Sequence, residues 1–388
     1  MRKHRLMTPG PSPVPEETLL ELAQPMFHHR TPEFQGVLKQ VLADLKYVFD
    51  TQHDVFILTS SGTGAMEAAV VNTVARGQKV LVLAAGRFGM RWAEIARAFD
   101  IEPVSVEVPP GQSVTPAQLE NALQSHPDVA AVFTTLCETS TGAGHDIETM
   151  GKLVVKTPAI FAVDAISGAG AMECRTDAWN IDILVTGSQK ALMMPPGLAF
   201  LTMSPKAWSR AEPVKQQAFY FDLKKMRKKI AVPDTPFTPA HTLIKALGTS
   251  LKKIRDEGIE NVWARHRRLA AACRAGVRAL GLDLFSAHPA DAVTSVTVPP
   301  NLDVSKLLSR LVERFGLKLT GGQDELKGKI FRIAHMGYMD ELDIIGTISA
   351  LEIVLTELNW PVKPGIPVAV AQAVFVESIA NNFKVMGA

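Results

Sequence analysis

The chain has 388 residues, 47% of them hydrophobic and 21% charged, which is the composition of an ordinary globular protein. At roughly 150 residues per domain, this length predicts two or three domains. Lys and Arg number 41 against 39 Asp and Glu, so the formal net charge of +2 gives no reason to expect nucleic acid or an anionic membrane as a partner.

The N-terminal stretch MRKHRLMTPGPSPVP is basic but lacks the apolar core of a secretory signal. Glycine, aspartate or lysine breaks the longest apolar stretches well short of a membrane span. We therefore expect a soluble, cytoplasmic protein. The three cysteines, Cys137, Cys174 and Cys273, are far apart and lack metal-binding spacing, so we expect buried or half-buried thiols and no metal site.

Short apolar runs alternate with longer helical patterns through the first two-thirds of the chain. The runs are VFILT (55–59), KVLVLA (79–84), AAVFTT (130–135), AIFAVD (159–164), IDILVTG (181–187) and LAFLTM (198–203). Continuous apolar runs of this length are typical of strands buried on both faces. Their alternation with helices predicts an α/β fold with a mostly parallel sheet.

Polar or glycine-rich residues follow four of these runs. They are SSGTG at 60–64, CETSTG at 137–142, Asp164, and SQK at 188–190. Ligands of parallel α/β sheets bind beyond the carboxyl ends of the strands. We therefore expect the four segments to converge on one crevice.

The last third of the chain has a different pattern. A helical stretch runs from about 243 to 280, and strand-like and helix-like segments then alternate up to residue 358. We predict a large domain over 1–257 that includes the N-terminal segment, a smaller α+β domain over 258–358, and a tail over 359–388 with a linker and a short amphipathic helix. The basic run KKMRKK (224–229) is interpreted as a solvated loop.

The SSGTG segment lies between a predicted strand and a predicted helix. Backbone N–H groups at a helix N-terminus, glycines that permit close approach, and the hydroxyls of Ser61 and Thr63 are suited to binding an anion. The segment matches neither the phosphate loop of nucleotide hydrolases nor GxGxxG. When the segment is considered alone, a turn that only caps a helix is the commoner interpretation. The functional interpretation is a binding site for a single phosphate, which we call a cradle.

Asp164 and Lys190 each follow a predicted buried strand. A carboxylate in that position needs a cation or hydrogen bonds, so Asp164 is either the N-cap of a following helix or the partner of a protonated ring nitrogen. Lys190 lies among small, uncharged neighbours in TGSQKALMMPPG. A desolvated lysine has a lowered pKa and forms a Schiff base with carbonyl compounds, although a single lysine is more often structural. Phosphate cradle, carboxylate and lysine together are the groups that bind pyridoxal 5'-phosphate (PLP).

With these motifs the chain resembles the class V, fold-type I PLP-dependent aminotransferases, and within them the alanine/serine–glyoxylate aminotransferase group. The resemblance implies a mostly parallel central sheet in a large domain and a smaller α+β C-terminal domain. The motifs follow the family order from residue 8 to about residue 358. They are TPGPSPVP, HHRTPEF, SSGTGAMEAA, ETSTG, VDAISGAG, TGSQKAL followed by PPG, and GKIFRIAHMG.

The resemblance implies roles for the catalytic and phosphate-binding residues. Lys190 is the lysine that forms the Schiff base with PLP, and Asp164 keeps the pyridine nitrogen protonated. The phosphate is bound by the turn Ser61, Gly62 and Thr63, together with Gln189.

It also implies contacts to the cofactor ring and to the substrate. Phe88 stacks on the ring where many relatives have Trp, Ile166 packs on the opposite face, and Thr139 hydrogen-bonds the ring hydroxyl. Arg332 binds the substrate carboxylate, for which a guanidinium fork is well suited. Gly10 and Arg30 shape the substrate pocket.

A homodimer with active sites at the subunit interface is a further implication. Thr238 matches a phosphate ligand that the neighbouring subunit supplies. The tyrosine that usually lies shortly before it is absent, with Thr235 and Phe237 nearby instead, so part of that contact is not matched here.

The implied reaction is a ping-pong transfer of an amino group from a small amino acid, alanine or serine, to a 2-oxo acid such as glyoxylate or pyruvate. One alternative is a PLP lyase such as a cysteine desulfurase. Those enzymes resemble this chain in the lysine and the aspartate, but they use a cysteine on a loop shortly before the substrate arginine, and His typically precedes their lysine. Here the stretch LTGGQDELKGK before Arg332 has no cysteine, and Gln189 precedes Lys190. A 2-aminoethylphosphonate-type transaminase and a binding or assembly subunit that keeps the fold are two further alternatives. The sequence does not name the donor.

Overall fold

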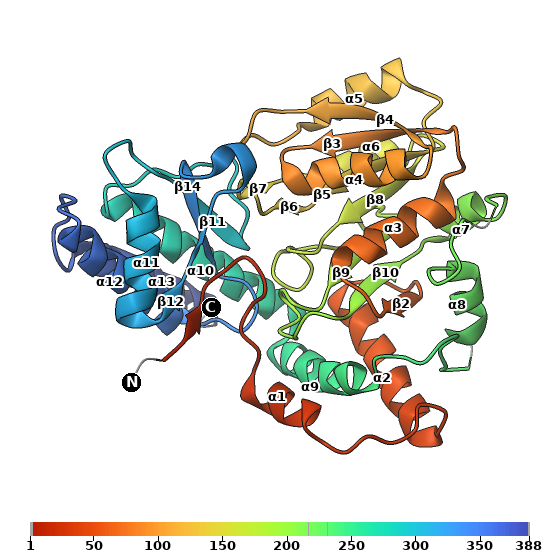
Figure 1. Ribbon diagram of the computed structural model, residues 1–388, viewed down its shortest axis with the longest axis horizontal. Coiled ribbons are helices and arrows are strands. Elements are labelled where there is room, and N and C mark those ends of the chain that lie inside the picture. The colour runs from red at the N-terminus through yellow and green to blue at the C-terminus, as the bar shows by residue number, and fades with distance from the viewer. Residues whose placement is uncertain (1–2, 216, 231, 387–388) are drawn as a thin grey trace.

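The structure is a computed structural model that describes residues 3–215, 217–230 and 232–386, with side chains described to residue 378 (Figure 1). Its central sheet has seven strands in the order β2-β10-β9-β8-β5-β3-β4. β10 is antiparallel to both of its neighbours and the other pairs are parallel, so the predicted mostly parallel sheet is confirmed. The strands are β2 Val55–Leu58, β3 Lys79–Ala84, β4 Glu102–Glu107, β5 Ala131–Thr135, β8 Ile160–Asp164, β9 Ile183–Gly187 and β10 Ala199–Thr202.

The edge strand β4 lies outside the predicted apolar runs. Its sequence, EPVSVE, alternates in polarity, and its middle residues are half-buried. A strand with one neighbour in the sheet keeps one side accessible to solvent and needs fewer apolar side chains. The pattern of a fully buried strand therefore does not detect it.

Helices cover both faces of this sheet. α3, α4, α7 and α8 pack on the face that includes Phe133, and α2, α5, α6 and α9 pack on the face that includes Val132. Neighbouring residues of β5 thus enter opposite cores, as the two-residue period of a strand requires. The helices are α2 Pro32–Val48, α3 Gly62–Thr73, α4 Arg87–Ala98, α5 Pro116–Ser125, α6 Ile147–Val154, α7 Pro205–Ala211, α8 Leu223–Ile230 and α9 His241–Glu257.

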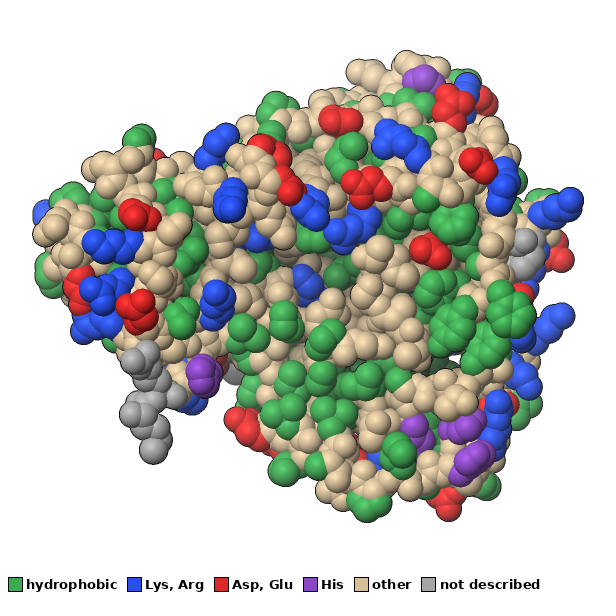
Figure 2. All heavy atoms as spheres, viewed as in Figure 1, with side chains coloured by type: hydrophobic (Ala, Val, Ile, Leu, Met, Phe, Trp, Pro, Cys, Tyr) green, Lys and Arg blue, Asp and Glu red, His purple; other side chains and the backbone are tan. Residues whose placement is uncertain are grey.

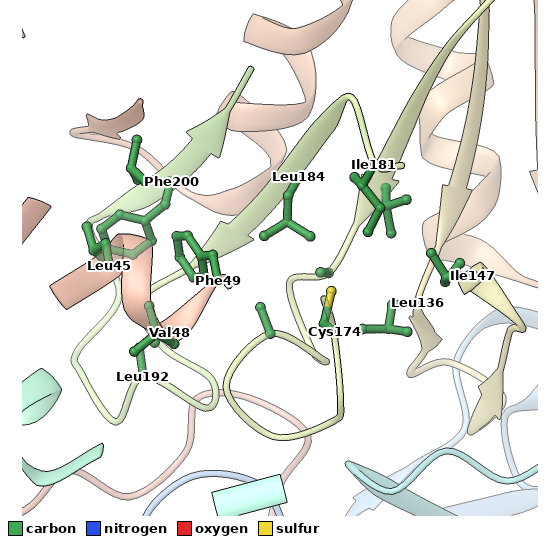
Figure 3. Close-up of a cluster of buried hydrophobic side chains, with 14 of the residues drawn as sticks. Leu45, Val48, Phe49, Leu136, Ile147, Cys174, Ile181, Leu184, Leu192 and Phe200 are labelled. Atoms are coloured by element: carbon green, nitrogen blue, oxygen red, sulfur yellow. The ribbon is translucent and has the colours of Figure 1, made fainter. Parts of the chain in front are cut away.

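Figure 3 shows part of the core on the α2 face. Val48 and Phe49 lie near Phe200 of β10 and Leu192, which follows Lys190 by two residues. All four side chains are buried. The loop after β9 that holds Lys190 is therefore anchored in this core.

The C-terminal third forms a separate buried cluster around a small antiparallel sheet in the order β11-β14-β13. A second pair of short strands, β1 and β12, joins the N-terminal segment to this region in parallel. Domain boundaries at 257 and 358 stay predictions. The strands are β1 Arg5–Leu6, β11 Val293–Thr297, β12 Leu317–Lys318, β13 Thr320–Gly321 and β14 Ile330–Ala334, and the helices are α10 Ile259–Ala279, α11 Val304–Phe315, α12 Glu341–Glu357 and α13 Ile366–Met386. The remaining short elements are α1 Glu16–Leu22, β6 Cys137–Glu138, β7 Ala143–Gly144 and η1 Asp324–Leu326.

Three helical segments differ from the sequence predictions. The predicted helical stretch is interrupted between α9 and α10 at Gly258, whose φ of +85° favours glycine. The run KKMRKK lies in helix α8 rather than in a loop, because Leu223 and Met226 are buried on one side of it. The C-terminal helix α13 has 21 residues and packs on α10 and α12, with Ala371 and Phe375 buried.

No helix within the described ranges is long and apolar enough to cross a membrane. All three cysteines are free and buried, as predicted.

Candidate active site

One pocket of about 280 Å³ lies at the carboxyl ends of the parallel strands. Its walls come from all four of the segments that the sequence predicted to converge, and from the N-terminal segment. Gly10, Pro11, Ser61, Gly62, Thr63, Phe88, Arg91, Cys137, Thr139, Asp164, Ile166, Ser167, Gln189, Lys190 and Pro196 line it.

Lys190 is buried at the base of this pocket and is held by the N-terminal segment. Its Nζ donates a hydrogen bond to the Pro9 carbonyl, and its own carbonyl accepts one from Ser12 Oγ at 2.5 Å. Burial, with a smaller contribution from the charge of Arg332, lowers the pKa of Lys190 to about 8. At pH 7 about one amine in ten is then uncharged and nucleophilic, far more than for an ordinary lysine.

Asp164 ends β8, beside β9, and is 5% exposed. Its Oδ1 accepts a hydrogen bond from the Ile166 N–H at 2.8 Å, so the carboxylate caps a turn and not a helix. Burial raises the pKa of Asp164 to about 7, and Glu138 adds to the rise, while Lys190 and Arg91 oppose it. A buried carboxylate with so few hydrogen bonds is stabilised by a cation, such as a protonated ring nitrogen.

The N-terminus of α3 forms the anion cradle that SSGTG predicts. Ser61 is the N-cap residue, and its side chain makes no capping hydrogen bond, which leaves the first N–H groups of the helix available. A Cβ on Gly62 would lie 2.4 Å from Ile166 Cδ1, so a side chain there would displace Ile166 from the pocket wall.

Gln189 lies next to the same helix end. A Cβ on Gly187 would be 2.9 Å from Gln189 Oε1 and 3.6 Å from the Gly62 nitrogen, so the amide and the helix N-terminus are close together. Gln189 Oε1 is buried and has no hydrogen-bond partner among the described residues. The two ends of an amide exchange by rotation, so the side chain offers the pocket an unsatisfied polar group.

Phe88 is placed by a buried carboxylate. Glu138 Oε2 accepts hydrogen bonds from the Phe88 N–H at 3.0 Å and the Gly89 N–H at 2.8 Å, and its Oε1 accepts one from the Ser140 N–H at 3.1 Å. The bonds from Phe88 and Gly89 satisfy N–H groups in the first turn of α4, where the helix dipole also favours a negative charge. The Phe88 ring is thereby held at the pocket wall.

Arg332 in β14 is 4% exposed and lies directly behind Thr139. Its Nη1 donates to the Thr139 carbonyl at 2.8 Å, and its Nε and Nη2 donate to the Gly321 carbonyl at 3.2 and 2.9 Å. Burial lowers the pKa of Arg332, and Glu138 opposes this. Among the described residues, these hydrogen bonds use three of the five N–H groups of the guanidinium, which leaves two for a further acceptor.

Three predicted site residues do not line this pocket. Arg332 is one of them, although its guanidinium bonds to the carbonyl of Thr139, which does line it. Arg30 and Thr238 are the other two. Arg30 is at the surface, where it pairs with Asp234 and donates to the Thr235 carbonyl at 3.1 Å. Thr238 lines a different depression, together with Tyr220 and Phe237. Within one chain, neither Arg30 nor Thr238 lines the pocket that contains Lys190.

Comparison with known proteins identifies the family. A model described as aminotransferase class-V matches residues 16–337. The soluble hydrogenase small subunit of Synechococcus sp. (strain PCC 6716) is 41% identical, over 96% of this chain and 98% of the relative. The L-aspartate–glyoxylate aminotransferase of Paracoccus denitrificans (strain Pd 1222) is 36% identical, over 98% of both chains. The chain belongs to the class V aminotransferases.

The fold of this class V aminotransferase matches solved structures over nearly its whole length. The ureidoglycine–glyoxylate aminotransferase of Bacillus subtilis superimposes with a TM-score of 0.91, at 27% identity, over 97% of this chain and 98% of the other. Serine–glyoxylate and alanine–glyoxylate aminotransferases are also among the matches. The protein is therefore a fold-type I, PLP-dependent transaminase.

The pocket of this aminotransferase fits PLP. Its volume is close to the lower end of about 300 Å³ for small-molecule sites. The uncapped N-terminus of α3 provides N–H donors for a phosphate, and the side-chain amide of Gln189 provides a further donor when its NH2 end faces the pocket. Asp164 supplies a carboxylate for a ring nitrogen, and Lys190 supplies an amine whose pKa is lowered.

Several residues of the aminotransferase site are not identified from the sequence, and three of them have contacts that define the site. Arg91 lines the pocket, Glu138 holds the start of α4, and Ser12 bonds to the Lys190 backbone. The spacing of Phe88 and Arg91, three residues apart in a helix, was a usable signal because such residues share a face. Ser12 and Glu138 act through contacts between distant segments, which no local pattern contains.

Proposed function

We propose that this transaminase moves the amino group of a small amino acid, alanine or serine, to a 2-oxo acid such as glyoxylate or pyruvate. The observation that supports this most directly is the position of Arg332. Its guanidinium bonds to the carbonyl of Thr139, a residue that lines the pocket, and its charge contributes to the lowered pKa of Lys190. A carboxylate bound there would bring the α-carbon of an amino acid close to the lysine.

In this proposal PLP is held by Lys190, Asp164 and the wall residues that line the pocket. Ser61, Gly62, Thr63 and Gln189 bind its phosphate, Phe88 and Ile166 contact its ring faces, and Thr139 bonds the ring hydroxyl. When bound, PLP supplies an electron-withdrawing ring that accepts charge from the α-carbon of the substrate.

The residues of the chain then have separate tasks. Arg332 orients the amino acid through its carboxylate. The uncharged amine of Lys190 would take the α-proton of the substrate as a base and deliver a proton to the C4' carbon of the cofactor as an acid in the same half-reaction. A base with a pKa near the working pH transfers protons well in both directions. The Pro9 carbonyl accepts a hydrogen bond from the same amine and limits its rotation.

Alanine and serine are the donors that we propose, because they need only one cation for their carboxylate, and Arg332 supplies it. The L-aspartate–glyoxylate aminotransferase of Paracoccus denitrificans takes aspartate according to its name, so aspartate is the donor to compare.

We further propose a homodimer in which Thr238 and Arg30 serve the site of the partner subunit. Thr238 lies away from Lys190 within its own chain, so a role at the phosphate requires a second copy. Several large hydrophobic side chains nearby are exposed, among them Phe219 at 77% and Tyr220 at 42%. Figure 2 shows hydrophobic side chains gathered on this face over α1, α9 and α8. A cytoplasmic location is proposed as well.

The test is to mix the purified, PLP-loaded protein with single amino acids and to follow conversion of the cofactor band to that of pyridoxamine phosphate. Alanine or serine should convert it, and glyoxylate or pyruvate should restore it. Aspartate serves as the comparison donor, and a Lys190→Ala variant as the inactive control. If no amino acid converts the band, the transaminase proposal is wrong.

A further inference from the structure

Arg91 is a cation of the pocket for which the site described above has no role. It lies on α4, one helical turn after Phe88, and its side chain is half-buried. The other arginines of this helix differ from it. Arg97 is exposed, and Arg87 pairs with Asp324 at the surface. Arg91 alone among the three lines the pocket.

Two contacts fix the Arg91 guanidinium. Its central carbon lies 5.0 Å from the centroid of the Phe88 ring, which is a cation–π distance, and its Nη1 donates a hydrogen bond to Thr63 Oγ1 at 3.3 Å. The guanidinium thus joins the helix that presents the aromatic ring to the helix whose N-terminus forms the anion cradle. These are the two elements on which the proposed ring and phosphate contacts depend.

The bond to Thr63 determines how that hydroxyl can act. A threonine hydroxyl has one proton to donate and two lone pairs to accept. Because a lone pair of Thr63 accepts from Arg91, the proton is free to be donated elsewhere, and an anionic oxygen at the end of α3 is a strong acceptor. The charge of Arg91 adds to the positive end of the α3 dipole in the same place.

We propose that Arg91 is a cofactor-positioning residue, which orients the Thr63 hydroxyl toward the phosphate, restrains the Phe88 ring, and contributes positive charge to the phosphate site. This inference rests on the proposed function, because it assumes that the cradle at α3 binds the phosphate of PLP. The inference adds to the proposed site a residue that acts by positioning Thr63 and Phe88 and takes no part in proton transfer.

The test compares full-length apoproteins. Arg91→Met removes the charge and both contacts, Arg91→Lys keeps the charge but loses the planar fork, and Arg97→Met removes an exposed arginine of the same helix as the matched control. Each is titrated with PLP and, separately, with inorganic phosphate as a competitor of PLP. The circular dichroism of the bound cofactor reports the restraint on its ring.

Arg91→Met should raise the dissociation constants of PLP and of phosphate about tenfold, because one charge-assisted contact is lost. A tenfold change in the dissociation constant corresponds to ~1.4 kcal/mol. Arg91→Lys should recover much of the phosphate affinity but not the wild-type dichroism, and Arg97→Met should match the wild type. Wild-type constants for both ligands in Arg91→Met would overturn the inference, as would an Arg91→Lys protein no better than Arg91→Met for phosphate. If the wild type itself binds no PLP, the proposed function fails. If the wild type binds PLP and Arg91→Met binds both PLP and phosphate equally well, this inference alone is removed.

Discussion

Gly10 lies directly against the amine of Lys190. A Cβ built on Gly10 would be 2.5 Å from both Nζ and Cε of that lysine, and the φ of Gly10 is +120°, which favours glycine. The same segment bonds to the lysine backbone through Ser12 and to β14, where the Ala334 N–H donates to the Met7 carbonyl at 2.9 Å. A short N-terminal segment thus connects the amine to the strand that contains Arg332.

A Gly10→Ala substitution should disable the amine without unfolding the protein. The methyl group would displace the Lys190 side chain, so we expect most molecules to lose the attachment of PLP to Lys190. Transamination should fall about 100-fold or more, which corresponds to a barrier higher by about 2.7 kcal/mol. Mass spectrometry after borohydride reduction measures the attachment. Gly36→Ala in α2 is the control, because nothing lies within 4 Å of its Cβ position and alanine favours a helix. Full attachment in Gly10→Ala would contradict the prediction.

The lowered pKa of Lys190 predicts how fast the apoprotein captures PLP at different pH. The rate of covalent capture should rise with pH and level off with a midpoint near pH 8, because the uncharged amine is the reactive form. An ordinary lysine continues to gain reactivity up to about pH 10.4. Subtracting the rate of a Lys190→Ala protein removes the contribution of surface lysines. A midpoint above pH 10 would show that burial does not tune this amine.

The raised pKa of Asp164 predicts the effect of an Asp164→Asn substitution on stability. The pKa of Asp164 is about 7 in the folded apoprotein and returns to its ordinary value near 4 on unfolding, so the folded state binds the proton more tightly. The apoprotein therefore loses stability as the pH rises from about 4 through about 7. The asparagine keeps an acceptor for the Ile166 N–H and has no charge. We therefore expect it to stabilise the apoprotein by a few kcal/mol at pH 8 and by little at pH 4.

Urea unfolding of both apoproteins at the two pH values measures this difference. The same substitution should lower transamination about 100-fold or more, because the carboxylate proposed to hold the ring nitrogen protonated is absent. An Asp164→Asn protein that is less stable than wild type at pH 8 would contradict the prediction. It would show that other groups of the apoprotein already stabilise the ionised carboxylate without the cofactor.

The sequence predicts the central sheet and the residues at its strand ends because these depend on local patterns. Asp164 and Lys190 each follow a continuous apolar run, and parallel strands place such ends at one edge. Arg332 has no such signal, since it lies in the buried strand sequence IFRIA and is defined by carbonyl groups of Thr139 and Gly321 that are distant in the chain. Arg91 resembles a solvated helix residue until α3 is placed beside α4. Helix α8 was missed because its many basic residues conceal the buried Leu223 and Met226.

Arg332→Lys is expected to separate substrate binding from cofactor binding. The lysine keeps the positive charge but has no planar fork to bind the Thr139 and Gly321 carbonyls and a carboxylate together. We expect the KM for alanine or serine to rise and kcat/KM to fall about 100-fold, roughly 2.7 kcal/mol, while the absorption of bound PLP is unchanged. Arg87→Lys, at a surface ion pair, is the control and should keep wild-type kinetics. If Arg332→Lys loses PLP but retains its KM for amino acids, the arginine supports the cofactor, and the substrate carboxylate is bound elsewhere.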